Sequence, residues 1–382
     1  MLRYLTAGET HGKCLTLIIE GMPSGVKIDI DEINDMLWRR QQGYGRGGRM
    51  KIERDTAEIL SGVRGGYTIG SPIAVKIENR DWQNWESIMS SGDCTSEKSV
   101  TAPRPGHADL VGGMKYEHKD LRNVLERASA RETAARVCAG AFAKQLLKQF
   151  GIYALTRCAS IGTINDNPGE LDEEFYKRAL VSPVGFGDAD AEKKAISFIE
   201  EAKNNGESVG GVVETAIKNV PPGLGSYVQY DRKLDANIAF AAMSIQAIKG
   251  VEIGMGFDAA KTLGSGVHDE ITHNADGYHR YSNNAGGIEG GMSNGEPIVV
   301  RAAMKPIPTL YKPLSTIDII SKETKKASVE RSDACAVYAC SVVLEACVSF
   351  EIAKAFCEKF GNDSINDIKK AYTDYMNRIK EF

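Results

Sequence analysis

The chain has 382 residues, of which 42% are hydrophobic and 26% are charged, and its formal net charge is −4. This composition is typical of a globular protein with one large domain or two ordinary ones. The negative net charge gives the whole molecule no electrostatic reason to bind nucleic acid. No apolar run approaches the length of about 18 residues that a membrane-spanning helix needs, and residues 1–12 lack the apolar core of a signal peptide. We therefore expect a cytoplasmic protein with no membrane partner.

The N-terminal residues predict a pair of strands followed by a helix. Residues 3–20 favour two strands joined by a polar turn at residues 8–12, GETHG, because the second strand is rich in apolar and β-branched side chains. Asp29 or Asp31 is expected to cap a helix that runs to about Arg40.

Three long apolar helices dominate the rest of the pattern. The first, over 129–150, is rich in alanine, which implies close packing against another helix, and Ser129 and Glu132 have the spacing of a capping box at its start. The second helix is expected over 234–248 and the third over 333–359.

The remaining segments are shorter and more polar. Alternation over 50–63 and 68–78 predicts a hairpin, and the irregular residues 81–110 form a connection of a length that is usually functional. Residues 258–296 are expected to be mostly loop. Further strands and polar helices are expected over 152–165, 209–220, 298–304, 171–180, 190–204 and 364–379. No repeat and no linker divides the chain, so 1–382 is predicted to form a single large α+β domain in which strands shelter the long helices.

The eight cysteines show no metal-binding or redox pattern. None forms a C-x-x-C pair, and a chain of this length does not need disulfide bonds for stability. Several lie in apolar helical runs, where a free cysteine acts as a small hydrophobic residue. We expect all of them to be reduced and structural.

A glycine-rich stretch, residues 283–309, is a candidate ligand cradle. Five glycines fall within residues 286–295, and an apolar run then leads to KPIPT at 305–309. Paired glycines before a strand can turn backbone amides toward an anion or a flat ring. An ordinary loop explains the pattern equally well. The stretch is neither a P-loop nor a G-x-G-x-x-G dinucleotide motif, because the residues that follow do not match.

Two histidines lie in glycine-containing turns. His11 follows Glu9 and Thr10, and His107 lies in RPGHAD at 104–109. A histidine beside glycine in a loop is a poor core residue and a good general acid, so function is the better interpretation for both. Metal binding by His268, Asp269 and His273 is the weaker alternative to a solvated loop, because their spacing matches no standard zinc pattern.

Arginines gather in two segments, one of which contains no acidic residue over 39–49. The members are Arg39, Arg40, Arg46, Arg49, Lys51 and Arg54 in the first segment and Arg122, Arg127, Arg131 and Arg136 in the second. The guanidinium fork matches phosphate and carboxylate groups. An arginine- and glycine-rich loop can also bind RNA, but the net charge favours a small ligand with several negative charges. Asp333, which follows Arg331, is expected either to cap the third long helix or to act as an active-site carboxylate.

Together, these segments resemble the chorismate synthase family. The matching motifs are GETHG at 8–12, RPGHAD at 104–109, SARET at 129–133, MSIQAIKGVEIG at 243–254, NNAGGIEGGMSNG at 283–295, KPIPT at 305–309 and RSD at 331–333. They follow the family's order over nearly the whole chain. Thr10 replaces the usual serine but keeps a hydroxyl, and Ala334 and Tyr338 replace residues that are commonly proline or small.

The resemblance implies a fold, a reaction and a cofactor. The family's fold is a β-α-β sandwich with long central helices between antiparallel sheets, assembled as a homotetramer. Its members are carbon-oxygen lyases, EC 4.2.3.5, which convert the small molecule 5-enolpyruvylshikimate 3-phosphate to chorismate by 1,4-anti elimination of phosphate, the last step of the shikimate pathway. The reaction requires reduced FMN although it is redox-neutral. Some members reduce the flavin themselves with NADPH and others rely on a separate flavin reductase, and both remain open for this chain.

The resemblance also assigns roles to individual residues. His11 would protonate the departing phosphate, His107 would stabilise the reduced flavin, and Asp333 would assist removal of the substrate's C6 proton. The substrate-binding residues would be Arg40, Arg46, Arg49, Arg104, Arg131 and Arg331. The FMN-binding residues would be Arg127, Ala128, Ser129, Gln246, Ala247, Gly290, Lys305, Pro306, Ile307, Pro308, Thr309 and Arg331. NADPH would contact Arg40 and Arg46, and no metal is expected.

Two other functions use the same sequence features. A conventional flavin oxidoreductase would place its redox substrate in the same pocket and consume NAD(P)H with each turnover. A non-enzymatic RNA-binding protein would use the basic residues of 39–54, in which case binding would be sensitive to salt.

Overall fold

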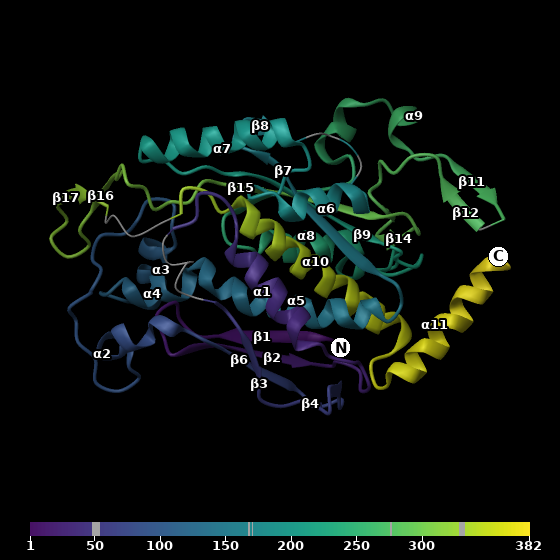
Figure 1. Ribbon diagram of the computed structural model, residues 1–382, viewed down its shortest axis with the longest axis horizontal. Helices are drawn as coiled ribbons and strands as arrows, with labels where there is room; N and C mark the ends of the chain where they lie inside the picture. Colours follow the sequence, from purple (N-terminus) through teal and green to yellow (C-terminus); the bar gives the residue numbers. More distant parts are fainter. Residues whose placement is uncertain (48–53, 167–168, 170, 276, 328–332) are drawn as a thin grey trace.

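The computed structural model describes residues 1–47, 54–166, 169, 171–275, 277–327 and 333–382. Its main chain forms two antiparallel sheets with a layer of helices between them (Figure 1). This arrangement is the β-α-β sandwich expected from the sequence.

The first sheet has four strands in the order β1-β2-β6-β3. Its members are β1 (Arg3–Ala7), β2 (Cys14–Glu20), β6 (Ile73–Glu78) and β3 (Ala57–Ile59). Leu15, Leu17 and Ile19 of β2 are buried, whereas the residues between them face outward. The strict alternation therefore directs one face of the sheet toward the helices. The hairpin expected over 50–78 is confirmed in its described part by β3 and β6, with a smaller hairpin between them. That smaller hairpin consists of β4 (Val63–Arg64) and β5 (Tyr67–Thr68).

The second sheet has five strands in the order β10-β15-β9-β7-β8. Its members are β10 (Ile248–Ile253), β15 (Ile298–Met304), β9 (Gly211–Lys218), β7 (Tyr153–Ile161) and β8 (Ile164–Asn165). One face covers the helix layer, and the other carries Leu155 and Ala216, which pack against Phe175 of α6 (Glu173–Val181).

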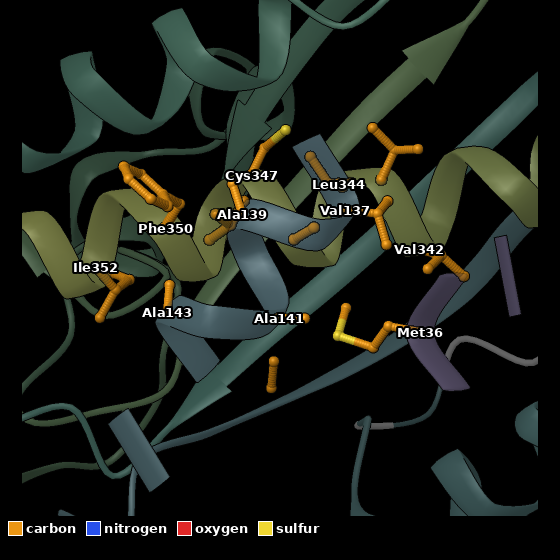
Figure 2. Packing of buried hydrophobic residues seen from close by; sticks show 14 of the residues in the cluster. Met36, Val137, Ala139, Ala141, Ala143, Val342, Leu344, Cys347, Phe350 and Ile352 are labelled. Carbon is orange, nitrogen blue, oxygen red and sulfur yellow. The ribbon is translucent and has the colours of Figure 1, made fainter. Parts of the chain in front are cut away.

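The helices α1 (Ile30–Gln41), α5 (Thr133–Lys148) and α10 (Val337–Phe360) form the middle layer. Helix α5 packs on β2, and α10 packs on β7 and β9, so each sheet is covered by one of the long helices. Figure 2 shows apolar side chains of α5 and α10, including Val137 and Leu344, and the side chain of Met36 of α1 pointing toward Ala141. The two long helices approach very closely, because a Cβ added at Gly140 would lie 2.4 Å from Cα of Ala346. The close packing predicted for the alanine-rich helix is confirmed.

A buried ion cluster ties the three helices of this layer together. Oε2 of Glu345 on α10 accepts a hydrogen bond of 2.9 Å from Arg39 of α1, and Oε1 accepts one from Lys144 of α5. Burial by itself raises the pKa of Glu345, but the two cations outweigh burial and lower it. The carboxylate that balances Arg39 thus comes from the far end of the chain.

The remaining elements surround this frame. The other described helices are α2 (Glu86–Met89), α3 (Asp109–Tyr116), α4 (Arg122–Ala128), α7 (Ala189–Asn204), α8 (Leu234–Met243), α9 (Gly264–Val267) and α11 (Ile365–Lys380). Its described hairpins are β11 (Ile271–Asn274) with β12 (Gly277–Arg280), β13 (Ile288–Glu289) with β14 (Met292–Ser293), and β16 (Ser315–Ile317) with β17 (Thr324–Lys326). Short 3₁₀ helices lie at Arg80–Asn84, Ala130–Glu132, Tyr230–Arg232 and Gly256–Lys261.

Three helix boundaries differ from the sequence-based expectation. The helix expected over 234–248 ends at Met243, and residues 248–253 instead form β10, whose backbone pairs antiparallel with β15. The helix expected from residue 129 begins at Thr133 after a 3₁₀ turn. The third begins at Val337, so the prediction that Asp333 caps it is wrong. Helices α3 and α4 and the hairpins within 258–296 were not expected.

Candidate active site

His11 lies in the turn between β1 and β2 and is held by the last turn of α4. Its Nδ1 lies 2.8 Å from Oε1 of Glu126, and its backbone N–H donates to Oε2 at 2.8 Å. The ring stacks on Trp85 with 3.7 Å between centroids and 17° between planes. Thr10 donates through Oγ1 to the backbone oxygen of Glu126 at 2.9 Å, so the hydroxyl that replaces serine is used.

Arg40 and Arg131 share one buried carboxylate. Nη2 of Arg40 and Nη1 of Arg131 lie 2.8 and 2.6 Å from Oδ2 of Asp55, which is 2% exposed. Burial alone raises the pKa of Asp55, but the two guanidinium groups lower it overall. Burial and the nearby charges of Arg131 and Arg46 lower the pKa of Arg40, and Asp55 offsets only part of this effect. Among the described residues, two guanidinium groups therefore lie against one carboxylate, an arrangement suited to an anionic ligand.

Asn79 connects this arginine pair to the His11 turn. Its Nδ2 donates to the backbone oxygens of Glu9 at 3.1 Å and Gly12 at 2.7 Å, and its Oδ1 accepts from Nε of Arg131 at 3.0 Å. The turn that carries His11 is therefore fixed relative to Arg131. Neither Asn79 nor Asp55 was singled out from the sequence, because nothing local distinguishes them from ordinary polar residues.

Arg104, His107 and Asp109 form a second cluster. Nδ1 of His107 lies 2.5 Å from Oδ1 of Asp109, and Nε of Arg104 donates to Oδ2 at 2.9 Å. Burial raises the pKa of Asp109, but the bonds from His107 and Arg104 outweigh it and lower the pKa. Arg104 also donates to Oγ1 of Thr309 at 3.2 Å, and Nζ of Lys305 donates to the backbone oxygen of Gly106 at 2.6 Å. These two bonds, between residues 205 and 199 positions apart in sequence, join the RPGHAD turn to the KPIPT segment.

Asp333 pairs with the N-terminal arginine segment. Its Oδ2 lies 3.2 Å from Nε of Arg46, and its Oδ1 accepts from the backbone N–H of Gly47 at 2.6 Å. The acidic partners that this segment lacks in sequence are thus supplied from elsewhere in the fold for Arg39, Arg40 and Arg46. Arg49 and Arg331 lie outside the described residues.

Two of the expected FMN-binding residues, Arg127 and Gln246, are linked to the C-terminal end of β1, Gln246 through Glu132, which accepts from Oγ1 of Thr6. Arg127 donates to the backbone oxygens of Gly8 and Thr6 at 3.1 and 2.9 Å. Nε2 of Gln246 donates to Glu132 at 3.1 Å, and its Oε1 is buried without a hydrogen-bond partner among the residues that the structure describes.

Two further contacts extend this group. The backbone oxygen of Ala247 accepts from the N–H of Lys305 at 2.9 Å, which brings residues 246–247 and 305–309 together. Ser129 accepts from the N–H of Arg131 at 3.3 Å. Ser129 is therefore confirmed as an N-cap, of the 3₁₀ turn that leads into α5. The Glu132 half of the expected capping box is wrong, because its carboxylate is bonded to Thr6, Gln246 and Arg136.

The glycine-rich stretch does not act as one unit. A Cβ at Gly286 would lie 2.3 Å from the backbone nitrogen of Gly254, and one at Gly287 would lie 2.5 Å from the oxygen of Pro297. A side chain at either position would clash with the backbone, so close chain packing explains these two glycines. This agrees with the interpretation of the stretch as an ordinary loop. Gly290 has open space around it and lies in the β13–β14 turn, beside the start of α8. Gln246 follows the opposite end of α8.

Comparison with known proteins gives a consistent identity. The sequence model of the Chorismate synthase family matches residues 2–357. The Chorismate synthase proteins of Pelobacter propionicus and Geobacter sulfurreducens are 56% and 55% identical to this chain, and each alignment covers 100% of both chains. This chain belongs to the chorismate synthase family.

The fold agrees with this assignment. A solved structure described as the crystal structure of chorismate synthase superimposes with a TM-score of 0.82 at 46% identity, covering 100% of this chain and 99% of that one. As a member of the chorismate synthase family, this chain is an enzyme and a lyase.

Other expectations concern the surroundings of the chorismate synthase site. All eight cysteines are unpaired, and the six that are buried pack as small hydrophobic residues, as expected. Cys14 is half-buried, and Cys94 is exposed, so the expectation of a structural role is wrong for Cys94. His268, Asp269 and His273 do not converge: Asp269 accepts from Ser282 and from backbone N–H groups of the following loop. Over the described ranges, no helix is both long and apolar enough to cross a bilayer.

Proposed function

We propose that this chain catalyses the elimination of phosphate from 5-enolpyruvylshikimate 3-phosphate to give chorismate, with reduced FMN as cofactor. The observation that carries the proposal is the arginine pair on Asp55, tied through Asn79 to the turn that holds His11. A cationic surplus beside a histidine is the arrangement that phosphate departure requires, because the leaving group is an anion that gains a proton.

The substrate's phosphate and two carboxylates account for the number of arginines. Arg40 supports this role directly, because its Nε is buried without a hydrogen-bond partner among the described residues. We assign Arg131, Arg46 and Arg104 to the same ligand, together with Arg49 and Arg331. Each of the described three is already oriented by a carboxylate, which reduces the cost of ordering long side chains on binding.

The residues present fit a flavin. The buried Oε1 of Gln246 can accept a hydrogen bond from a donor such as a ring N–H. Arg127 and Lys305 supply positive charge for an anionic ring or phosphate. We assign Ala128, Ser129, Ala247, Pro306, Ile307, Pro308 and Thr309 to the same cofactor. Gly290 joins this set only through a neighbouring subunit or a rearrangement, because it lies at the other end of α8. Reduced FMN would supply electron density to the carbon-oxygen bond that breaks.

The chain's own residues would handle the protons. His11 donates a proton to the departing phosphate, and Asp333, oriented by Arg46 and Gly47, assists removal of the C6 proton. His107 is locked between Asp109 and Arg104, which suits a fixed electrostatic role toward the reduced cofactor better than rapid reorientation. Loss of one proton and of the phosphate leaves the product redox-neutral.

We also propose a homotetramer in the cytoplasm. Large apolar side chains of the α8 region are exposed in the single chain, with Phe240 and Tyr230 both 77% exposed and Tyr227 73% exposed. A monomer seldom leaves so much apolar surface uncovered. NADPH, contacting Arg40 and Arg46, and a separate flavin reductase remain alternative sources of reducing equivalents.

The deciding experiment is an anaerobic assay with chemically reduced FMN and 5-enolpyruvylshikimate 3-phosphate. Stoichiometric phosphate and chorismate, formed with a catalytic amount of flavin, are expected. Formation of no product would refute the function. Consumption of one NAD(P)H per product would instead indicate a flavin oxidoreductase, and salt-sensitive RNA binding lost in the R46A/R49A double variant would indicate an RNA-binding protein.

A further inference from the structure

Glu126 is hydrogen-bonded to His11 through both carboxylate oxygens. Oε1 lies 2.8 Å from Nδ1 of the ring, and Oε2 accepts the backbone N–H of the same residue at 2.8 Å. The carboxylate is 1% exposed. An ionised carboxylate can only accept hydrogen bonds, so Nδ1 must carry a proton, and proton exchange with a ligand would take place at Nε2.

The surroundings leave the imidazole little freedom to rotate. Trp85 covers one face of the His11 ring at 3.7 Å between centroids. The backbone N–H and Oγ1 of Thr10 both donate to the backbone oxygen of Glu126, at 3.1 and 2.9 Å. The plane of the ring and the edge it presents are therefore both set by α4 and Trp85.

Arg122 keeps the carboxylate ionised. Its Nη1 donates to Oε1 of Glu126 at 3.0 Å, and its Nε donates to the backbone oxygen of Lys98, which anchors the guanidinium. Burial raises the pKa of Glu126, but the bonds from His11 and the charge of Arg122 outweigh burial and lower it. The same carboxylate thus remains an acceptor before and after His11 gives up a proton.

We propose that Glu126 is a positioning residue for the proton transfer: it holds His11 as the Nδ1–H form and stabilises the imidazolium whose Nε2–H proton goes to the departing phosphate. This inference rests on the proposed function. In the step, the carbon-oxygen bond breaks with its electron pair passing to the phosphate oxygen, and that oxygen takes the Nε2 proton. The electron pair of the C6–H bond enters the new double bond of the ring, and the C6 proton is released with the assistance of Asp333. His11 is left neutral with Nδ1–H on Glu126, which stays ionised throughout.

A double-mutant cycle tests this, because a residue that acts through His11 has nothing to act on when His11 is absent. The kcat and KM for phosphate release are measured anaerobically for wild type, E126Q, H11A and H11A/E126Q. E126Q is expected to lower kcat about 100-fold with KM changed less than about threefold. In the H11A background the same substitution is expected to change kcat less than about twofold.

Glu214 supplies the matched control. It is another buried glutamate, bonded at 2.8 Å to Nε of Arg157 between β7 and β9, so E214Q is expected to lower Tm while leaving kcat close to wild type. If E126Q does not fold, E126D replaces it in the cycle, with a smaller loss that also vanishes without His11.

The outcomes separate the two proposals. Wild-type kcat in E126Q, or an equal loss in both backgrounds, overturns the role of Glu126 while leaving the lyase intact. An inactive wild type instead overturns the proposed function, and a fully active H11A overturns the role of His11 and with it that of Glu126.

Discussion

Arg40 and Arg131 donate to the same oxygen of one buried carboxylate, at 2.8 and 2.6 Å. Arg40, on α1, and Arg131, just before α5, are thereby held at a fixed separation, although their positive charges repel. An anion between or beside them would relieve that repulsion, so substrate binding and structural stability are coupled at this point.

Replacing Asp55 with asparagine should damage both properties. The substitution preserves the shape of the side chain but leaves two buried guanidinium groups without their shared anion, which should reduce the free energy of unfolding by about 3 kcal/mol. Urea denaturation checks this value. Turnover should fall at least about tenfold, because the arginines lose their orientation. D55N with wild-type stability would contradict the account, and E214Q tests whether loss of any buried pair has the same effect on turnover.

The stability of the protein should fall in acid partly through Glu345. Its pKa is lowered in the fold, so the ion cluster contributes fully above the ordinary value of 4.5 and is lost as the pH falls through the folded-state pKa. Wild-type Tm should therefore decline below about pH 4.5. E345Q should have a lower Tm at pH 7 and a shallower acid decline, measured by calorimetry from pH 7 to 3. An equally steep decline in E345Q would assign the acid sensitivity to other carboxylates.

His107→Ala should preserve the fold and remove most turnover. Asp109 keeps its bonds to Arg104 in the variant, so no buried carboxylate is left without a partner. We expect kcat to fall about 100-fold with little change in Tm. His273, an exposed residue of the β11–β12 hairpin, provides a control in which alanine should change neither quantity. Unchanged turnover in H107A would refute its assigned role.

Gly140→Ala should separate the two long helices. The added Cβ would lie 2.4 Å from Cα of Ala346, a distance that the α5–α10 crossing must widen to accommodate. A loss of about 1–3 kcal/mol in the free energy of unfolding is expected, measured by denaturant titration. Alanine at Gly92, whose Cβ would meet only the hydroxyl of Ser90 at 3.8 Å, should be nearly neutral. Equal effects at the two sites would mean that helix separation is not the cause.

Most of the long helices and strands, and the family resemblance, could be predicted from the sequence. Periodicity located the long helices and most strands of both sheets, because burial of one face leaves a regular pattern along the chain. The histidines in glycine-containing turns marked the candidate site because such residues are poor core residues. The arginines of 39–49 marked it because no acidic residue of that segment balances their charge. The motifs that carry the family resemblance are likewise read directly from the chain.

Tertiary structure alone decided which groups act together. Asp55, Asn79 and Glu126 look ordinary in sequence, and they acquire roles only because the β1–β2 turn meets α4 and the arginine of SARET in space. Two helix starts were predicted wrongly for the same reason. Glu132 and Asp333 are residue types that often cap helices, but their carboxylates are bonded to residues distant in sequence, Gln246 and Arg46. Periodicity records which side of an element is buried, and it carries no information about which distant charge will meet it there.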